Sequence, residues 1–282
     1  MQDFNGKLAV ITGAASGIGR GLAEKAASLG MNLVLADVDQ AGLEQLKQDL
    51  VTSRDVAVEV RHTDVSDPDE IEALADFAFT RFGTVDLLFN NAGVMISGMS
   101  WERDLKDWNW VMGVNLYGVV NGIRSFLPRM MTQGTPARIV NTGSISGFLS
   151  SPAISIYSAS KHAVVSLSET LKFELELARS QVGVSVICPG AVTTQIADAD
   201  RNRPEKEKPM EDEAHKAMKD QLRQGLAATG MDPAKAADIV FDAIGEEKFW
   251  IFTHPEYLTR IRQEAEAVAQ QKNPVYQPLV DM

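Results

Sequence analysis

With 282 residues and a hydrophobic content of 45%, the chain is long enough and apolar enough to bury a sizeable core. Its 27 basic and 38 acidic residues give a net charge of −11 without a Lys/Arg cluster, so we expect neither nucleic acid nor an anionic membrane as a partner. The apolar runs are of strand length, the N-terminus lacks the features of a signal peptide, and the single cysteine, Cys188, cannot form an internal disulfide, all of which favours a cytoplasmic protein.

Short β-branched, apolar runs alternate with longer amphipathic segments from residue 7 almost to the end of the chain. The apolar runs predict strands at 7–12, 32–36, 56–60, 85–89, 137–141, 183–188 and 249–252. The intervening segments predict helices at 17–30, 40–52, 67–82, 105–133, 157–180 and 233–245. Continuously apolar strands that alternate with helices are typical of a parallel sheet covered on both faces. Because no repeat and no Pro/Gly-rich linker divides the chain, we expect one doubly wound α/β domain over residues 1–282.

The first predicted turn, TGAASGIGRG, has T-G-x-x-x-G-x-G spacing and lies between a strand and a helix. Glycines let the chain turn tightly and let a pyrophosphate approach the backbone N–H groups at the start of the next helix. Any tight strand-to-helix turn also favours glycine, but the strand before and the helix after favour a nucleotide site. The predicted cofactor-binding residues of this turn are Gly13, Ser16, Gly17, Ile18 and Gly19.

Asp37 ends the second predicted strand, where a carboxylate can accept hydrogen bonds from the adenosine ribose hydroxyls. The same carboxylate would repel the additional phosphate of NADP. The neighbouring positions that could bind this phosphate hold Ser16 and Val38, which are not basic. A helix cap is the structural alternative for Asp37, but Asp39 is better placed for that role. The sequence therefore favours NAD over NADP.

The loops after the third and fourth strands also carry polar residues. Asp64, in HTDVSDPDE, can hold the adenine amino group, or the stretch can simply start a helix with Ser66 or Asp67 as its cap; the local sequence leaves both open. The stretch NNAG, residues 90–93, places small residues and side-chain amides at the end of the fourth strand. Ligands of doubly wound sheets lie across the carboxyl ends of the strands, so all these loops should face one crevice.

Tyr157 and Lys161 stand four residues apart in YSASK, so one face of a helix presents both. A phenol with a pKa of about 10 is a poor base at neutral pH. A nearby ammonium, together with the positive charge of an oxidised nicotinamide, would stabilise the phenolate and let it exchange a proton with an alcohol. Ser144 can hydrogen-bond the same substrate oxygen, and the amide of Asn115 can hold a water that links Lys161 to solvent. Taken singly, each residue also has an ordinary structural explanation.

The motifs T-G-x-x-x-G-x-G, N-N-A-G, Y-x-x-x-K and CPGAVTT occur in this order, each after a predicted strand or on the following helix. In this combination the chain resembles the short-chain dehydrogenase/reductase family over about residues 5–253, without a departure at a catalytic position. The resemblance implies a Rossmann-type fold with a seven-stranded parallel sheet and helices on both faces. It assigns Tyr157 as the acid/base, Lys161 as the group that lowers its pKa and binds the nicotinamide ribose, Ser144 as the group that orients the substrate, and Asn115 as a support of proton relay.

The same resemblance implies further cofactor contacts. Asp64 and Val65 would contact adenine, and Asn91, Ala92 and Gly93 would line the cofactor. Pro189, Gly190, Val192 and Thr194 would hold the nicotinamide carboxamide and fix which face of the ring reacts. Family members are commonly dimers or tetramers joined through the helices at about 105–133 and 157–180, so we expect a homodimer or a homotetramer.

Residues 195–230 form a long charged insertion in which Met218, Leu222 and Leu226 recur at helical spacing. Such an insertion is either a functional lid or a disordered excursion, and the apolar stripe favours a substrate-binding lid. Residues 255–282 are expected to form a helix and a tail that either frays or docks on a neighbouring subunit.

The length of the lid and the stretch NRPE, residues 202–205, resemble the branch of the family that acts on bulky aryl or polycyclic secondary alcohols. We therefore expect a small-molecule substrate that is bulky and hydrophobic, an aryl carbinol or a steroid-like alcohol. Ordinary core packing is the alternative for each apolar pocket candidate. The predicted substrate-binding residues are Met95, Ser144, Ser146, Phe148, Leu149, Ile154, Ala191, Ile196 and Met218.

The hypothesis is thus an NAD-dependent oxidoreductase that interconverts a secondary alcohol and its ketone. An NAD-retaining epimerase or dehydratase on the same fold is one alternative, and a non-enzymatic NAD-binding regulator is another. The regulator would have no use for the four predicted catalytic residues together. The four histidines show no metal-ligand spacing, so we expect no metal, and Cys188 is expected to be a core residue rather than a catalytic thiol.

Overall fold

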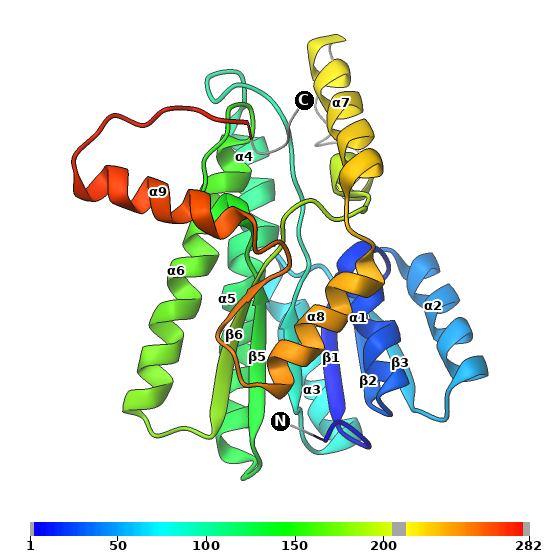
Figure 1. The fold of residues 1–282 in the computed structure, drawn as a ribbon. Helices are drawn as coiled ribbons and strands as arrows, with labels where there is room; N and C mark the ends of the chain where they lie inside the picture. The colour runs from blue at the N-terminus through cyan, green and yellow to red at the C-terminus, as the bar shows by residue number, and fades with distance from the viewer. Residues whose placement is uncertain (1–2, 205–212, 279–282) are drawn as a thin grey trace.

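A computed structural model describes residues 3–204 and 213–278 of the chain. Within this part, seven strands form one parallel sheet in the order β3-β2-β1-β4-β5-β6-β7 (Figure 1). This order confirms the predicted Rossmann-type α/β fold. The strands are β1 (Leu8–Thr12), β2 (Asn32–Asp37), β3 (Val58–His62), β4 (Leu87–Asn90), β5 (Ala137–Thr142), β6 (Val182–Cys188) and β7 (Trp250–Phe252).

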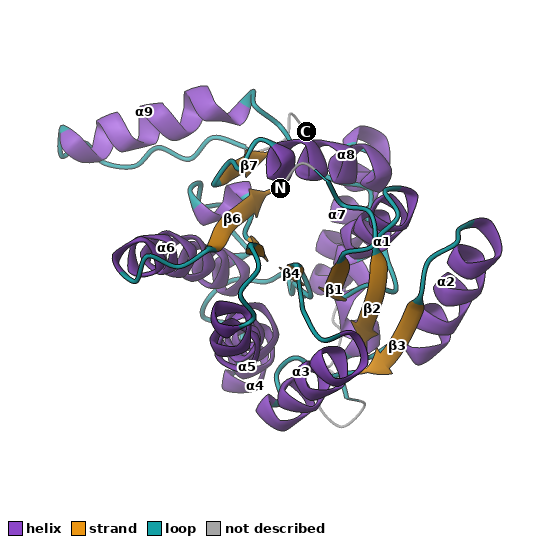
Figure 2. Cartoon of the chain, turned by 90° about the horizontal axis from the view of Figure 1, so that it is seen from below, coloured by secondary structure: helices purple, strands orange, loops and turns teal. Residues whose placement is uncertain are grey.

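Helices cover both faces of the sheet, as Figure 2 shows from below. One face carries α1 (Gly17–Ser28), α2 (Gln40–Ser53) and α8 (Pro233–Gly245), and the other carries α3 (Pro68–Phe82), α5 (Gly118–Thr132) and α6 (Ser155–Leu177). The remaining helical elements are α4 (Leu105–Met112), η1 (Gly113–Tyr117), η2 (Ile145–Gly147), η3 (Ile196–Asn202), α7 (Glu213–Thr229) and α9 (Tyr257–Ala269). No helix of the described residues is long and apolar enough to cross a membrane.

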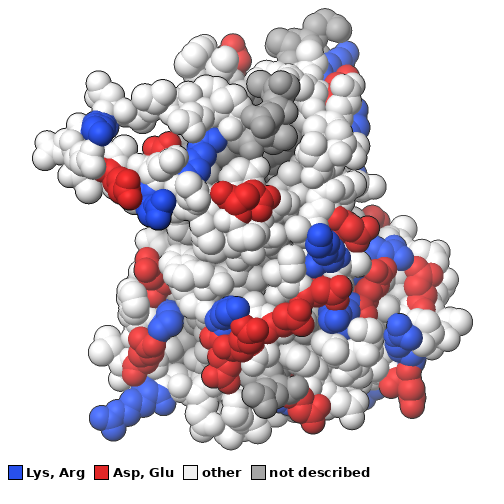
Figure 3. Space-filling view, in the orientation of Figure 1, with Lys and Arg blue, Asp and Glu red and all other residues white. Residues whose placement is uncertain are grey.

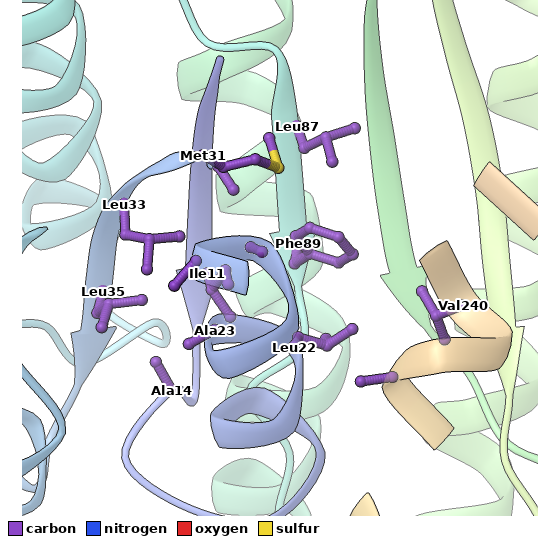
Figure 4. Packing of buried hydrophobic residues seen from close by; sticks show 14 of the residues in the cluster. Ile11, Ala14, Leu22, Ala23, Met31, Leu33, Leu35, Leu87, Phe89 and Val240 are labelled. Carbon is purple, nitrogen blue, oxygen red and sulfur yellow. The ribbon is translucent and has the colours of Figure 1, made fainter. Parts of the chain in front are cut away.

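The strands are apolar on both faces because both faces are buried. In β1, Ala9 and Ile11 belong to one hydrophobic cluster and Leu8 and Val10 belong to the other. Figure 4 shows the first cluster, in which side chains of β1, β2 and β4 meet Leu22 of α1 and residues of α8. Because all the strands are parallel, their carboxyl ends meet at one edge of the sheet.

Two predicted helices begin where the expected caps stand. Asp39 caps α2 by accepting a hydrogen bond from the N–H of Gly42, which leaves Asp37 for another role. Asp67 caps α3 by accepting from the N–H groups of Asp69 and Glu70. The cap is therefore Asp67 rather than Ser66.

Several predicted boundaries differ from the structure by a few residues, among them the following three. The expected helix at 105–133 contains a π-helical segment, η1, between α4 and α5, because Asn115 pairs with a neighbouring loop there. The strand expected at 56–60 runs from Val58 to His62, since β3 is an edge strand whose pairing with β2 sets its start. Helix α6 begins at Ser155, two residues before Tyr157.

Two segments project beyond the carboxyl ends of the strands. Figure 1 shows α7, from the insertion, above this edge, while α9 reaches away from the body and has no buried residue. The predicted amphipathic helix of the insertion is therefore present. Residues 205–212 of the expected lid and residues 279–282 of the tail lie outside the described residues.

Candidate active site

The carboxyl ends of the strands, η3, α7 and the chain's tail enclose a cavity of about 1850 Å³. Its size exceeds that of an ordinary small-molecule pocket, which holds roughly 300–1000 Å³, and so leaves room for two ligands side by side. Every predicted cofactor-binding residue lines this cavity: Gly13, Ser16, Gly17, Ile18, Gly19, Asp37, Asp64, Val65, Asn91, Ala92, Gly93, Tyr157, Lys161, Pro189, Gly190, Val192 and Thr194.

The glycine turn is packed too closely for side chains, as a phosphate cradle requires. A Cβ atom at Gly13 would lie 2.7 Å from the Cα of Ala92, and one at Gly19 would lie 2.0 Å from the carbonyl oxygen of Gly13. Gly17 adopts φ +54°, and a Cβ there would lie 2.9 Å from Cγ2 of Thr194. The turn thus exposes backbone at the start of α1, where anions are stabilised, and it fits a dinucleotide.

Two carboxylates stand at the side of the cavity formed by β2 and β3. Asp37 Oδ2 accepts a hydrogen bond from the N–H of Ala15, at 3.0 Å, and Oδ1 accepts from the N–H of Asp39. This anchors Asp37 beside the glycine turn, at the position expected for a ribose-binding acid. Asp64 Oδ1 accepts from both the N–H and the hydroxyl of Ser66, so the residue organises its own loop while it lines the cavity.

Asn91 joins three strand ends. Its Nδ2 donates to the carbonyl oxygens of Thr12, at 3.0 Å, and Gly13, at 3.3 Å, and its Oδ1 accepts from the hydroxyl of Thr142. The side chain therefore has a structural function, and Asn91 and Ala92 can line a cofactor mainly through their backbone. Asn91 lines the cavity, but its amide fixes the strand ends rather than facing the cavity as a free group.

Tyr157, Ser144 and Lys161 converge in the centre of the cavity wall. The hydroxyls of Tyr157 and Ser144 are hydrogen-bonded, and Ser144 Oγ also accepts from the N–H of Ser146 at 3.0 Å. Lys161 Nζ lies 5.6 Å from the centroid of the Tyr157 ring and donates to the carbonyl oxygen of Thr142 at 2.7 Å. Helix α6 and the end of β5 thus hold a phenol, a hydroxyl and an ammonium around one point.

The electrostatics of this group differ from the sequence expectation. Burial raises the pKa of Tyr157, and the hydrogen bond with Ser144 lowers it only in part. Burial also lowers the pKa of Lys161 to about 8, since the residue is only 3% exposed. The protein groups alone therefore do not lower the pKa of the phenol, as we expected from Lys161. The other expected contribution is the positive charge of an oxidised nicotinamide, which would lie against the same groups.

Asn115 is fully buried in the π-helical segment and does not line the cavity. Its Oδ1 accepts from the N–H of Val94 at 2.8 Å, and its Nδ2 donates to the carbonyl of Val94 and to the hydroxyl of Ser160. Both amide hydrogens are used within the protein, so a water linking Lys161 to solvent stays a prediction that the Nδ2 group would not serve. Asn115 instead fixes the NNAG loop to α6, and Gly93 lies between its Oδ1 and Lys161 Nζ.

The stretch from Pro189 to Thr194 is positioned by a histidine that the sequence did not single out. The N–H of Gly190 donates to His254 Nδ1 at 3.2 Å, and the ring lies so close that a Cβ atom at Gly190 would meet its Cγ at 2.7 Å. Burial lowers the pKa of His254, which keeps Nδ1 free to accept this bond at neutral pH.

Seven of the nine predicted substrate-binding residues line the cavity: Met95, Ser144, Ser146, Ile154, Ala191, Ile196 and Met218. The predictions for Phe148 and Leu149 are wrong, because η2 turns the chain away after Ser146: the N–H groups of Phe148 and Leu149 donate to the carbonyl of Ile145. Phe148 packs against Trp250 and Phe252 instead, with ring centroids 5.6 Å apart in each pair, and Leu149 is a core residue.

Other cavity residues were not predicted at all. Tyr276 and Pro278 line it because the tail folds back, held by Arg260, which donates to the carbonyl oxygens of Gln277 and Pro278. Arg201 of η3 donates from Nη2 to Ser16 Oγ at 3.4 Å. The sequence showed no basic residue at positions 16 and 38, where one could bind a phosphate, whereas the fold brings Arg201 to Ser16 from 185 positions away.

Among the described residues, no group of three or more His, Cys, Asp or Glu side chains is arranged to hold a metal. Cys188 is buried, and burial raises its pKa to about 12, so it is poorly suited to act as a thiolate.

Comparison with known proteins supports the reading of the site. A family model for short chain dehydrogenases matches residues 7–205. A solved short chain dehydrogenase/reductase from Burkholderia phymatum, in complex with NAD, is 46% identical, with a TM-score of 0.95 over 99% of each chain. A 1-deoxy-11-beta-hydroxypentalenate dehydrogenase from Streptomyces exfoliatus is 32% identical, over 93% of this chain and 88% of the relative. A C alpha-dehydrogenase from Sphingobium sp. is also 32% identical, over 95% of this chain and 87% of the relative. The chain therefore belongs to the short-chain dehydrogenase/reductase family.

Proposed function

We propose that this protein is an NAD-dependent dehydrogenase that interconverts a bulky, hydrophobic secondary alcohol and its ketone. The observation that carries the proposal is the convergence of Tyr157, Ser144 and Lys161 in the wall of a cavity that also contains the glycine turn. An oxidoreductase needs a hydride acceptor and a proton acceptor on either side of one carbon–oxygen bond, and the cavity offers a place for each.

In the oxidative direction, Ser144 hydrogen-bonds the alcohol oxygen and Tyr157 takes its proton. A bound nicotinamide supplies the two-electron acceptor for the hydride that leaves the carbinol carbon. Lys161, fixed by Thr142, lies beside Tyr157, and the positive charge of a bound oxidised nicotinamide would favour the ionised phenol. In the reverse direction, Tyr157 returns the proton to the ketone oxygen.

Asp37 supports NAD as the cofactor, because its carboxylate lines the cavity beside the glycine turn and would repel a 2′-phosphate. The similar structure from Burkholderia phymatum contains NAD. We expect Asp37→Ala to reduce the ratio of kcat/KM with NAD to that with NADP by about tenfold or more, as the loss of a charged hydrogen-bonding group would. An unchanged ratio would place the selecting group elsewhere.

Apolar residues of the insertion support a hydrophobic substrate. Met218, Leu222 and Leu226 of α7 line the cavity together with Met95 and Ile154. The relative from Streptomyces exfoliatus acts on a hydroxylated pentalenate, as its name states. An aryl carbinol or a polycyclic alcohol is therefore the substrate class that we propose.

The test is NADH formation, followed at 340 nm, across small aliphatic, benzylic, two-ring aryl and steroid secondary alcohols, with NADP in parallel. We expect turnover of the bulky alcohols, and a loss of about 10³-fold or more for Tyr157→Phe with nearly unchanged NAD binding. Substantial activity of this variant would contradict the role of Tyr157. Tight NAD binding without net reduction by any alcohol would contradict the dehydrogenase and favour an epimerase or a dehydratase.

A further inference from the structure

Arg201 is the one cation of η3 that faces the glycine turn among the residues described. Its side chain lines the cavity, and Nη2 approaches Ser16 Oγ, the residue directly before Gly17. The guanidinium is held in this place, because Nη1 donates to the backbone oxygens of Gln195, at 2.9 Å, and Asp198, at 3.0 Å. A basic group is thus positioned over a turn whose exposed backbone fits a phosphate.

The acidic residues near Arg201 already have other partners. Asp198 pairs with Arg223 and Lys219 of α7, at 2.6 and 3.5 Å, and Asp200 pairs with Lys219 at 2.8 Å. Within the described part of the chain, Arg201 forms no ion pair with a carboxylate. Its positive charge is therefore available to a ligand in the cavity.

The hydrogen bonds of Arg201 leave a suitable edge free. A guanidinium has five N–H donors, and the two on Nη1 are used by backbone oxygens. The Nε–H has no partner among the described residues, and the bond from Nη2 to Ser16 is long. The Nε and Nη2 groups form the fork that binds phosphate oxygens in a bidentate manner.

The insertion also contacts the glycine turn at a second point. Thr194, directly before the insertion, packs its methyl group against Gly17, and its Oγ1 accepts a hydrogen bond from the N–H of Ile196. The segment 194–201 therefore contacts the glycine turn at both of its ends, through Thr194 and through Arg201. A ligand on the turn would contact both ends of this segment.

We propose that Arg201 binds a phosphate group of the dinucleotide and so couples cofactor binding to the ordering of η3. This inference rests on the proposed function, since it assumes that a dinucleotide lies on the glycine turn. The position of Ser16 favours the pyrophosphate, whereas a 2′-phosphate would also meet the carboxylate of Asp37. In both cases the Nε and Nη2 groups of Arg201 would bind oxygens of a phosphate.

The test is calorimetric titration of the full chain with ADP-ribose, ADP, adenosine and adenosine 2′-monophosphate. For Arg201→Ala we expect about ten- to hundredfold weaker binding of ADP-ribose and ADP, the loss typical of a hydrogen bond to a charged group, and unchanged binding of adenosine. Arg201→Lys should fall between the two, because it retains the charge but not the fork. Arg54→Ala, at an exposed arginine that does not line the cavity, is the matched control.

Each outcome separates the two proposals. If the native chain binds none of the phosphate ligands, the proposed function fails together with the inference. If the native chain and Arg201→Ala bind ADP equally well, the inference alone is overturned. A loss confined to adenosine 2′-monophosphate would support phosphate binding by Arg201 but identify NADP as the source. Hydrogen exchange of peptides spanning 196–203 gives a second readout: ADP should slow the exchange in the native chain and not in Arg201→Ala.

Discussion

The helical spacing of Tyr157 and Lys161 predicted that they share one face, and they do, because residues four apart are neighbours on any α-helix. The pKa shifts could not be predicted in the same way. They depend on the burial of the Tyr157 and Lys161 side chains, which results from contacts with residues far away in the sequence. Lys161 shows this best: its nearest polar partner, the carbonyl of Thr142, is on another element.

At the residue scale we expect Lys161→Met to stabilise the protein while it abolishes turnover. Burial lowers the pKa of Lys161 from 10.5 to about 8, so the folded state releases a proton that the unfolded chain retains. This difference destabilises the fold by on the order of 3 kcal/mol at pH 7, partly offset by the hydrogen bond to Thr142, worth about 1–2 kcal/mol. The net gain on substitution should be about 1–2 kcal/mol.

Urea unfolding at pH 7 and pH 10 measures this effect. The penalty is complete below pH 8 and disappears as the pH rises towards 10.5, so the advantage of the variant should shrink at pH 10. Lys172→Met, at an exposed lysine on the same helix, should change stability by less than about 0.5 kcal/mol. If Lys161→Met is less stable than the native chain at pH 7, the buried ammonium of Lys161 does not destabilise the fold.

At the scale of elements, the sequence predicted every strand and all six of the helices that cover the sheet, because their hydrophobic patterns are long and regular. It did not predict the π-helical segment. That segment depends on the pairing of Asn115 with Val94, which is not a local signal. The turn at η2 was missed for a similar reason, and Phe148 and Leu149 were assigned to the wrong surroundings with it.

A buried ion pair between Arg203 and Asp107 attaches the insertion to α4. Arg203 Nη1 lies 2.6 Å from Asp107 Oδ1, with side chains 1% and 6% exposed, and its guanidinium lies over the ring of Trp110. Arg103 approaches the other carboxylate oxygen of Asp107 at 3.7 Å. One carboxylate therefore compensates two cations, and its loss would leave a buried positive charge.

We expect Asp107→Asn to lower the free energy of unfolding by about 3–5 kcal/mol, the effect of breaking a buried ion pair. Asp220→Asn, which removes an exposed partner of Arg223, should cost less than about 1 kcal/mol. The double substitution Asp107→Leu with Arg203→Met should recover part of the loss, because only Arg103, whose side chain is 13% exposed, is then left without its carboxylate. Denaturant midpoints of the four proteins measure this, and a value for Asp107→Asn within 1 kcal/mol of the native chain would contradict it.

At the scale of the whole molecule, the seven-stranded parallel sheet followed from the family resemblance, and the parallel strands place all the motifs at one edge of the sheet. The convergence of distant segments was harder to foresee. Arg201, Tyr276 and His254 reach the cavity region through contacts that no local pattern encodes. The overall charge gave the least information about the site: on the face shown in Figure 3, acidic and basic side chains of the described residues are interspersed.

At the same scale, the association of the chain into a homodimer or a homotetramer stays a prediction. Helix α6 and the end of η1 carry large apolar side chains on the surface of the single chain: Tyr117 is 57% exposed, Phe173 52% and Leu177 86%. Exposed aromatic residues on helices that otherwise pack the core are typical of an interface between subunits. They lie on the two helical regions, 105–133 and 157–180, through which the family resemblance implies a dimer or a tetramer.

We therefore expect the native chain to sediment as a dimer or a tetramer, and Phe173→Glu to shift it towards smaller species. A buried carboxylate without a partner would cost several kcal/mol at a symmetric interface, where each substitution is present twice. Val51→Glu replaces an apolar residue of similar exposure, 46%, on α2 and should leave the assembly unchanged. Sedimentation velocity over a range of concentrations distinguishes these cases. A monomeric native chain, or a Phe173→Glu variant that assembles as the native chain does, would place the contact elsewhere, and the exposed arm of α9 would be the next surface to test.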